Sequence, residues 1–373
     1  MKDTMQHTLQ KLIDRHDLAA SEAGAVFDQL MDGRLTPAQT GAFLTALRMK
    51  GESVEELTGA ASAMRRHAVL IDTGGIPVVD TCGTGGDRAG TFNISTTAAF
   101  VVAGAGVPVA KHGNRAVTSQ CGSADVLIAL GINIEVPPET VEECIRDIGI
   151  GFLFAPNLHP AMKHVAPVRR ELGIRTIFNM LGPLTNPANA RGQILGVFAP
   201  ELTESFAAVL RALGSKRVFI VHGRDGLDEI TVTTTTHITE LRDGHLRTYE
   251  LDPLPLIGAY HSLDSLRGGT PQANAAITRR VLAGESGAAR DIVLLNAAAG
   301  IVAGGKADDL NQGFELAKTS IDSGQAAAKL KALIEQSGSS DKSVGENGED
   351  SPQSHRDTET RDRGDRVNSG PFA

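Results

Sequence analysis

Apolar positions in the first part of the chain recur with the spacing of a helix. The segment TPAQ at residues 36–39 combines an N-cap hydroxyl, a proline at the first helical position and a capping-box glutamine. An apolar face over residues 43–47 follows, Gly51 ends it, and residues 53–56 repeat the capping device. The pattern predicts a small N-terminal helical domain over residues 1–72.

From about residue 76, short β-rich runs alternate with helical runs, an order typical of a parallel α/β sheet. The expected strands are IPVVD (76–80), VPVAKHG (107–113), INIEV (132–136), GFLFAP (151–156) and RVFIVHG (217–223), followed by a hairpin over THITELRDGHLRTYEL (236–251). Helices are expected near 94–105, 124–130, 139–148 and 203–213, and further helices to about residue 335. The sequence therefore predicts a larger α/β domain over residues 73–335, with a central, mainly parallel sheet.

The last stretch, residues 336–373, differs in composition from the rest of the chain. It is rich in Ser, Gly, Asp, Glu and Arg and almost lacks large apolar groups. Such a segment buries too little surface to offset the entropy lost on ordering, so we expect a disordered polar tail. The tail is either a solvated extension or an interaction segment.

Composition and charge limit the class of protein. The net charge is −8, with acids and bases interspersed and no basic run, which argues against a nucleic-acid partner. Three cysteines without a CxxC pair fit a reducing compartment better than a disulfide framework. The polar N-terminus does not resemble a signal peptide, and the apolar stretch over residues 98–110 is too short to span a bilayer. We expect a soluble, cytoplasmic protein without membrane association.

Three loops that follow expected strands carry the groups that bind anions. The first, CGTGGD (82–87), is rich in glycine, which permits positive φ and close approach of backbone N–H groups to a phosphate. The second, TFNIST (91–96), opens a helix, whose free N–H groups attract an anion. The third, KHGNRAVTSQCGSAD (111–125), adds Lys111 and Arg115. Each loop alone could be a flexible turn or a helix cap, but three at the carboxyl ends of strands favour a ligand with several phosphates.

Carboxylates near these loops point to a metal ion. Asp87 ends the glycine-rich loop, and Asp228 and Glu229 are adjacent in GLDEI, after a further strand. Beside phosphates a bare carboxylate would be repelled, so such acids are typical of Mg²⁺ or sugar-hydroxyl binding. The alternative for the pair is plain surface charge. Neither a Walker sequence nor a complete GxGxxG motif is present.

Five segments, taken in order, resemble anthranilate phosphoribosyltransferases, enzymes of tryptophan biosynthesis. They are GTGGD (83–87), GTFNIST (90–96), KHGNRAVTSQCGSADVLIALG (111–131), HPAMKHVAPVRRELGIRTIFNMLGPLTNP (159–187) and GLDEI (226–230). The resemblance extends from the N-terminal helices to about residue 335. It implies a helical domain joined by helices near 160–185, an α/β domain, a homodimer formed through the helical part, and a reaction of phosphoribosyl pyrophosphate that uses Mg²⁺.

The resemblance also implies site residues. For phosphoribosyl pyrophosphate these are Gly83, Gly86, Asp87, Thr91, Asn93, Ile94, Ser95, Thr96, Lys111, His112, Gly113, Asn114, Arg115, Ala116, Val117, Thr118, Ser119 and Ser123. For anthranilate they are Gly83, Asn114 and Arg169, and for Mg²⁺ they are Ser95, Asp228 and Glu229. No catalytic acid or base is implied, because the aromatic amine is already neutral at pH 7 and needs only to be held in line with the anomeric carbon.

Some positions depart from the usual pattern of these enzymes. Gln120 and Cys121 stand where a small or basic residue and a serine are more common, and Ile128 stands where Glu is common. None of the three is among the implied ligands, so the departures affect loop detail only. Two alternatives stay open: a pyrimidine nucleoside phosphorylase-like enzyme and a non-catalytic nucleic-acid-binding relative.

Overall fold

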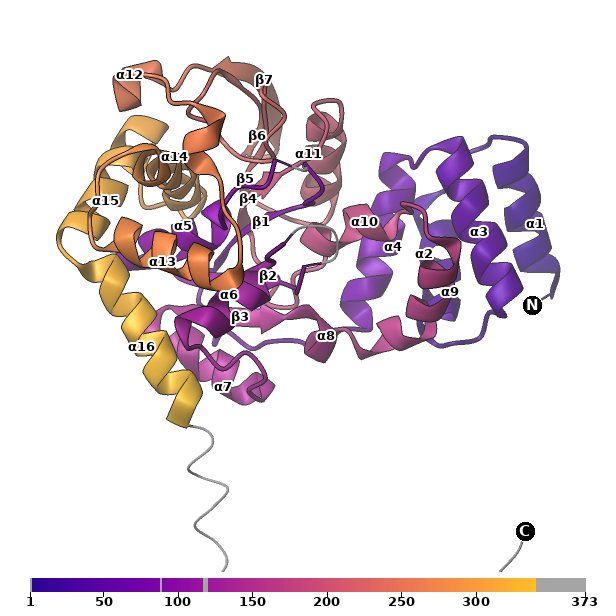
Figure 1. Cartoon of the computed structure of the whole chain (residues 1–373). Helices are drawn as coiled ribbons and strands as arrows, with labels where there is room; N and C mark the ends of the chain where they lie inside the picture. Colours follow the sequence, from indigo (N-terminus) through magenta and orange to yellow (C-terminus); the bar gives the residue numbers. More distant parts are fainter. Residues whose placement is uncertain (1, 88, 117–119, 340–373) are drawn as a thin grey trace, which may run out of the picture. The chain divides into compact units, whose positions relative to one another are not determined.

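The structure is a computed structural model that describes residues 2–87, 89–116 and 120–339 (Figure 1). Residues 340–373 of the expected tail lie outside the described residues, so the disorder expected there stays a prediction. The last helix among the described residues, α16 (Gln325–Ser339), continues past residue 335. Within the described part, no helix has both the length and the apolar character needed to cross a bilayer.

The N-terminal domain consists of α1 (Lys2–Ile13), α2 (Ala20–Met31), α3 (Pro37–Lys50) and α4 (Val54–Arg66). Both expected capping boxes are present. The Thr36 hydroxyl accepts from Gln39 N at 3.2 Å, Gln39 Oε1 accepts from Thr36 N at 3.0 Å, and Ser53 forms the second box. Two later helices, α9 (Ala166–Leu172) and α10 (Phe178–Leu181), pack on α3 and α4 (Figure 1). A segment far along the chain therefore completes the helical domain.

A seven-stranded sheet forms the centre of the second domain, in the order β3-β2-β1-β4-β5-β6-β7. The strands are β1 (Val79–Gly83), β2 (Val109–Gly113), β3 (Ile150–Phe154), β4 (Gly192–Gly196), β5 (Arg217–Gly223), β6 (Thr236–Arg242) and β7 (His245–Leu251). The first five are parallel, and β6 and β7 are antiparallel to their neighbours. The predicted fold class, a helical domain with a mainly parallel α/β domain, is confirmed.

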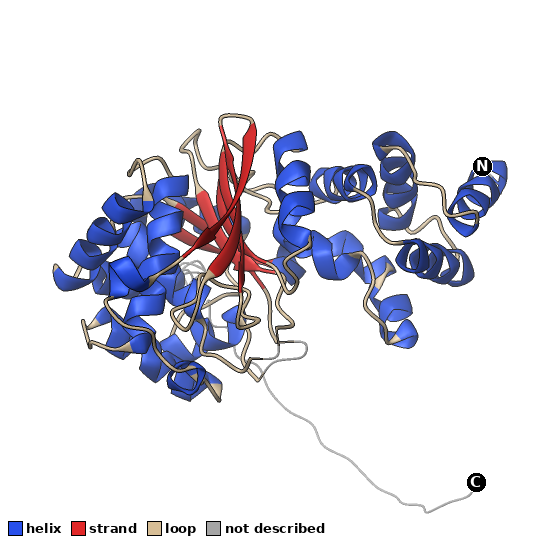
Figure 2. Ribbon diagram, turned by 90° about the horizontal axis from the view of Figure 1, so that it is seen from above, coloured by secondary structure: helices blue, strands red, loops and turns tan. Residues whose placement is uncertain are grey.

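Helices cover both faces of this sheet (Figure 2). They are α5 (Ile94–Gly104), α6 (Ser123–Leu130), α7 (Pro138–Glu143), α8 (Ala155–Leu158), α11 (Leu202–Ala212), α12 (Leu254–Ile257), α13 (Pro271–Leu282), α14 (Ala288–Ala303), α15 (Leu310–Asp322) and α16. Single turns of 3₁₀ or π helix span Cys144–Ile148, Pro160–His164, Gly182–Leu184 and Leu263–Leu266.

Strand β5 shows how the sequence pattern produces this layering. Val218 and Ile220 belong to a core shared with α11 and the helical domain, whereas Phe219 and Val221 belong to a core shared with α5 and α14. Successive side chains of a strand point to opposite faces of its sheet. A run of consecutive apolar residues therefore requires cover on both faces.

Two local expectations had different outcomes. The predicted hairpin is confirmed, with Asp243 (φ 51°) and Gly244 (φ 82°) in the left-handed region that a tight two-residue turn requires.

The predicted strand INIEV, residues 132–136, was wrong. Its apolar side chains are buried, but Asn133 Oδ1 accepts from Glu135 N at 3.0 Å and Asn133 N donates to Ser337 Oγ at 3.2 Å. Side-chain oxygens thus accept backbone N–H groups that would otherwise donate to a neighbouring strand. Residues 132–136 therefore do not extend the sheet, and β3 remains its edge strand.

The order of strands also locates a crevice. Strands β1, β2 and β3 follow one another in one direction across the sheet, and β4 and β5 follow in the other. The order therefore reverses between β1 and β4. In open α/β sheets, ligands bind at the carboxyl ends of the strands at this point of reversal.

Candidate functional site

The loop after β5 crosses the carboxyl ends of β1 and β4. A Cβ atom at Gly83, the last residue of β1, would lie 2.7 Å from Asp228 Oδ2, and one at Gly196, the last residue of β4, would overlap the backbone carbonyl of Asp228. Only glycine leaves room for the loop at both strand ends. The two glycines therefore place the GLDEI acids at the point where the strand order reverses.

Both acids accept hydrogen bonds from the anion-binding loops. Asp228 Oδ2 accepts from Gly85 N at 3.0 Å, and Glu229 Oε1 accepts from Ser95 N, in the first turn of α5, at 3.1 Å. The structure thus joins the first and second predicted loops to the predicted metal ligands. In this state the carboxylates occupy N–H groups that a bound phosphate would also need.

The charged forms of these acids are disfavoured here. Burial, followed by the charge of Asp87, raises the pKa of Asp228 to about 7. Burial and the charge of Asp228 raise the pKa of Glu229 well above its usual value. Crowded carboxylates with raised pKa values are stabilised in their charged forms by a cation. Oxygen ligands of this kind suit a hard cation such as Mg²⁺.

The protein offers this cation few ligands. Among the described residues, no group of three or more His, Cys, Asp or Glu side chains is arranged to hold a metal. Asp228, Glu229 and the Ser95 hydroxyl fit Mg²⁺ as a partial set, because Mg²⁺ commonly keeps water molecules and takes further oxygens from substrate phosphates.

Lys111 supplies a buried positive charge between β1 and α5. Its Nζ donates to the Thr81 carbonyl and lies 3.5 Å from Ser95 Oγ. Burial lowers the pKa of Lys111, and the nearby Asp80 opposes that shift. The side chain is 4% exposed, so the ammonium is held inside the site before any ligand binds.

Asp80 and Asn186 form a positioning pair that the sequence reading missed. Strands β1 and β2 pair at one position only, Val79 with Val109, whereas β1 pairs with β4 at five positions. Asp80 bridges the opening: its Oδ1 accepts from His112 N at 3.1 Å, and its Oδ2 accepts from Asn186 Nδ2 at 2.8 Å. Asn186 belongs to the LTNP segment of the resemblance, so this segment braces the strand that carries Lys111.

The second loop contributes mainly its backbone. Ile94 and Thr96 have buried side chains. Asn93 Nδ2 donates to the Cys121 carbonyl at 3.1 Å, and Asn93 Oδ1 accepts from Asn274 Nδ2, on α13, at 2.9 Å. The Asn93 side chain therefore joins the second loop to the third.

The third loop is folded over the start of α6. Ser123 Oγ lies 3.2 Å from both the N and the O of Asn114, and Asp125 Oδ2 accepts from Ala116 N at 2.9 Å. Arg115 pairs with Glu135 at 3.2 Å. A Cβ atom at Gly113 would overlap Ser123 Oγ, so the tight packing at the end of β2 requires glycine. The predicted ligands Val117, Thr118 and Ser119 lie outside the described residues.

The predicted anthranilate residues come from three elements: Gly83 ends β1, Asn114 follows β2 and Arg169 lies on α9. No hydrogen bond joins Arg169, on α9, to Gly83 or Asn114 within the described part of the chain, and the Arg169 guanidinium lies 5.0 Å from the ring centre of Phe178. Burial lowers the pKa of Arg169. Thr91, predicted to contact phosphoribosyl pyrophosphate, forms an isolated bridge with Arg267.

Two buried imidazoles lie next to each other at the end of β2. The rings of His112 and His159 are 5.1 Å apart, and neither Nε2 has a hydrogen-bond partner among the described residues. Burial lowers the pKa of His112 to about 3 and that of His159 to about 4, so both are neutral at pH 7. Buried polar atoms without partners are costly, which makes them candidates for ligand contact. His159 was missed as a site residue although it begins the HPAM segment.

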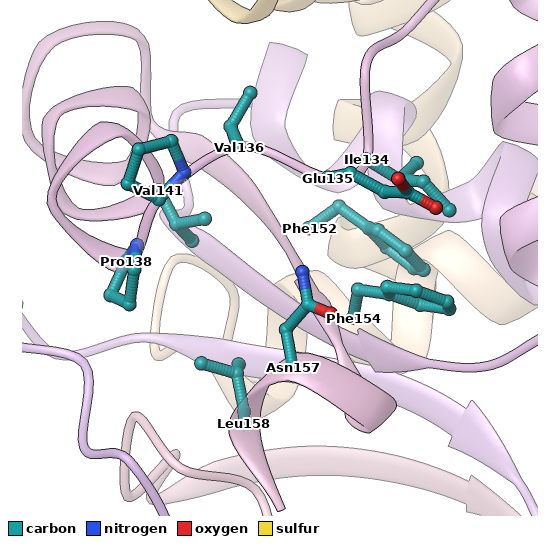
Figure 3. A pocket seen from close by; sticks show the side chains of 10 residues that line it. Ile134, Glu135, Val136, Pro138, Val141, Phe152, Phe154, Asn157 and Leu158 are labelled. Carbon is teal, nitrogen blue, oxygen red and sulfur yellow. The ribbon is translucent and has the colours of Figure 1, made fainter. Parts of the chain in front are cut away.

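A separate cavity of about 250 Å³ lies between β3, α8 and the chain before α7 (Figure 3). Apolar side chains line most of it, including Phe152, Phe154 and Leu158, with Glu135 and Asn157 as polar groups. None of the predicted ligands among the described residues lines this cavity.

Comparisons with known proteins give a consistent result. Residues 75–327 match the a/b domain of the glycosyl transferase family, and residues 6–68 match the helical bundle domain of that family. An anthranilate phosphoribosyltransferase of Syntrophobacter fumaroxidans is 57% identical over 88% of this chain and 98% of its own length. One from Desulfosudis oleivorans is also 57% identical, over 88% of this chain and 97% of its own length.

Solved structures agree with the sequence relatives. The crystal structure of anthranilate phosphoribosyltransferase from Thermus thermophilus superimposes with a TM-score of 0.84 at 44% identity, covering 88% of this chain and 99% of that one. The enzyme from Saccharomyces cerevisiae in complex with PRPP and Mg has a TM-score of 0.81 at 32% identity, covering 91% of this chain and 99% of its own. A further structure of the yeast enzyme contains 4-fluoroanthranilate.

Proposed function

This chain belongs to the anthranilate phosphoribosyltransferase family, and from that premise we propose which of its residues carry each part of the transfer. The reaction moves the phosphoribosyl group of phosphoribosyl pyrophosphate onto the amine of anthranilate and releases pyrophosphate, a step of tryptophan biosynthesis. One observation carries the assignment of the site: Asp228 and Glu229 meet the N–H groups of Gly85 and Ser95 where the strand order reverses.

The pyrophosphate end of the donor binds at this point. Asp228, Glu229 and Ser95 Oγ would hold Mg²⁺, and the bound ion would supply positive charge against the leaving pyrophosphate. With the carboxylates bound to a cation, the N–H groups of Gly85 and Ser95 would be free to bind phosphate oxygens. Lys111 adds a fixed positive charge that stabilises the departing group. The remaining described residues of the three loops complete the phosphoribosyl site mainly through backbone groups.

Anthranilate binds against α9 and the end of β2. Arg169 pairs with its carboxylate, and Gly83 and Asn114 bound the space next to the ribose. The neutral imidazoles of His112 and His159 offer their unpartnered Nε2 atoms to the aromatic acid. Neither imidazole is required as a base, because the aromatic amine attacks as a neutral group once it is aligned with the anomeric carbon. The new C–N bond leaves a positively charged nitrogen, whose proton passes to water or to the released pyrophosphate.

We further propose that the protein is a cytoplasmic homodimer that associates through the helical domain. Ile13 on α1 and Met49 on α3 are large apolar side chains that are 65% and 69% exposed, and these two helices pack against each other. Exposed apolar side chains on neighbouring helices favour association with a second copy.

The direct test is a fluorescence assay of anthranilate consumption with phosphoribosyl pyrophosphate and Mg²⁺. We expect anthranilate fluorescence to fall, and to fall only when all three components are present. Circular dichroism of the same sample verifies that the protein is folded. Persistence of anthranilate with folded protein would contradict the proposal, and phosphorolysis of a pyrimidine nucleoside by the same sample would favour the phosphorylase alternative.

A further inference from the structure

Arg175 contacts the glycine-rich loop from the segment between α9 and α10. Its guanidinium donates to the Gly86 carbonyl at 3.2 Å and lies 4.7 Å from the ring centre of Phe198. Gly86 has a φ of +86°, and a Cβ atom there would lie 2.5 Å from the guanidinium. The close approach of Arg175 therefore depends on glycine at position 86.

Three successive residues of the loop are held by three different partners. Thr84 N donates to the Gly196 carbonyl at 2.8 Å, and the Thr84 hydroxyl accepts from Phe198 N at 3.2 Å. Gly85 N is held by Asp228, and Gly86 O by Arg175. The first two partners come from the sheet domain, whereas Arg175 comes from the segment that joins the helical domain.

Substrate binding would remove one of these three contacts. On the proposed function, Asp228 would bind Mg²⁺ and no longer accept from Gly85 N, which would then donate to a phosphate oxygen. Thr84 and Arg175 are then the remaining protein contacts of this stretch. Thr84 fixes the start of the loop on β4, and Gly90, whose carbonyl accepts from Gly268 N at 2.9 Å, fixes its end. Arg175 holds the stretch around Gly86 between these two anchors.

We propose that Arg175 is a positioning residue that clamps the glycine-rich loop over phosphoribosyl pyrophosphate. The inference rests on the proposed function, because the loop is the one assigned to that substrate. Arg175 acts through the Gly86 carbonyl and is held in place by the Phe198 ring, which suits the planar guanidinium. Arg169 lies on α9, directly before this segment, so neighbouring parts of the chain carry residues proposed for both substrates.

The test compares Arg175→Ala and Arg175→Gln with the wild type, with Arg170→Ala as the matched control. Arg170 is an exposed arginine on α9, outside the set of described contacts that hold the loop. For Arg175→Ala we expect KM for phosphoribosyl pyrophosphate to rise about tenfold, the size expected when one hydrogen bond that orders a loop is lost. KM for anthranilate should change less than about twofold, since Arg175 does not contact that substrate's proposed ligands.

Arg175→Gln separates a clamp from a direct charge contact. The glutamine amide keeps a donor for the Gly86 carbonyl and loses the positive charge, so a clamp predicts that KM for phosphoribosyl pyrophosphate returns at least halfway to the wild-type value. Equal KM values for phosphoribosyl pyrophosphate in the Gln and Ala variants would overturn the clamp. It would also be overturned if KM for anthranilate rose as much as, or more than, KM for phosphoribosyl pyrophosphate.

Hydrogen exchange provides a readout that does not depend on activity. In substrate-free Arg175→Ala, amides of residues 84–87 should exchange at least about threefold faster than in the wild type, because a tether of the loop has been removed. Amides of β4 should be unchanged, and Arg170→Ala should match the wild type throughout. Unchanged exchange at residues 84–87 in Arg175→Ala would overturn the clamp proposal, whatever the enzyme assay shows. That result would not affect the proposed function, which depends on the transferase activity of the wild type.

Discussion

Asp228 and Glu229 each occupy a backbone N–H that a bound phosphate would use. Replacing both by Asn and Gln keeps their shape and removes the charge that makes them ligands of a hard cation. We expect the double variant to stay folded, because crowded loop carboxylates repel each other without a cation. Its rate should fall by orders of magnitude at low Mg²⁺ and recover partly at high Mg²⁺. Mg²⁺ titrations of the rate for both proteins test this, and superimposable curves would show that the two carboxylates are not Mg²⁺ ligands.

Arg169 is expected to decide anthranilate affinity. Arg169→Ala removes a charge-assisted partner of a carboxylate, a loss of about 2 kcal/mol, which is a rise of about 30-fold in KM for anthranilate. The KM for phosphoribosyl pyrophosphate should stay within about twofold of the wild type. Steady-state kinetics with each substrate varied in turn measures both values. Equal increases in the two KM values would show that Arg169 supports the fold of the site and does not pair with anthranilate.

His159 should make stability depend on pH below neutrality. Its pKa is lowered in the folded protein to about 4, from an unfolded value near 6.5, so the unfolded chain binds more protons between these values. Stability is therefore complete above about pH 6.5 and falls as pH decreases toward 4, by at most about 1.4 kcal/mol per pH unit for this group. His112 adds a dependence of the same sign.

His159→Gln should reduce that slope, because the variant lacks the titrating group. Urea unfolding at several pH values between 4.5 and 6.5 gives the slope for each protein. His245→Gln, at an exposed histidine of β7, is the control and should keep the wild-type slope. Parallel slopes for the wild type and His159→Gln would contradict the buried, neutral state of this imidazole.

At the scale of elements, helices α2 and α4 touch through their backbones. A Cβ atom at Gly59 of α4 would overlap the carbonyl of Ala20 and lie 2.9 Å from Gly24 N. Gly59→Ala must push the helices apart, and we expect it to lower the free energy of unfolding by about 1–3 kcal/mol, as overpacking does.

Gly41→Ala on α3 is the matched control. The nearest atom to its Cβ would be Val168 Cγ1 at 3.8 Å, so the new methyl group fits. Here the helix preference of alanine should raise stability by up to about 1 kcal/mol. Thermal unfolding of both variants tests the pair, and an equal effect of the two substitutions would show that the spacing of α2 and α4 is adjustable.

At the scale of the whole molecule, the exposed apolar side chains of α1 and α3 bear on assembly. If the helical domain forms the dimer contact, Met49→Glu buries an unpaired charge there, which is strongly unfavourable. Light scattering on a sizing column should then show the mass fall from twice to once that of the chain. Leu254→Glu on α12 of the α/β domain is the control and should keep the wild-type mass. A wild-type mass of one chain at micromolar concentration would contradict the dimer.

Local signals in the sequence account for most of the fold. The capping boxes at Thr36 and Ser53 and the turn at Asp243 and Gly244 involve residues within a few positions of each other, so their contacts form wherever the segment lies. Consecutive apolar residues in β5 required cover on both faces of the sheet. Because parallel strands end at one edge, the three anion-binding loops were expected to converge, and the first two meet at Asp228 and Glu229.

Only the tertiary structure decided which side chains face a ligand and which brace the site. Asn93, expected to bind substrate, uses its amide to join Cys121 and Asn274. Residues 132–136 alternate between apolar and polar side chains as a strand does. Their backbone N–H groups nevertheless donate to side-chain oxygens, one of them on α16, and not to a neighbouring strand. Asp80 meets Asn186 across 106 positions, and Gly86 meets Arg175 across 89. Such pairings have no local signature, because they depend on which surfaces come together when distant helices and strands pack.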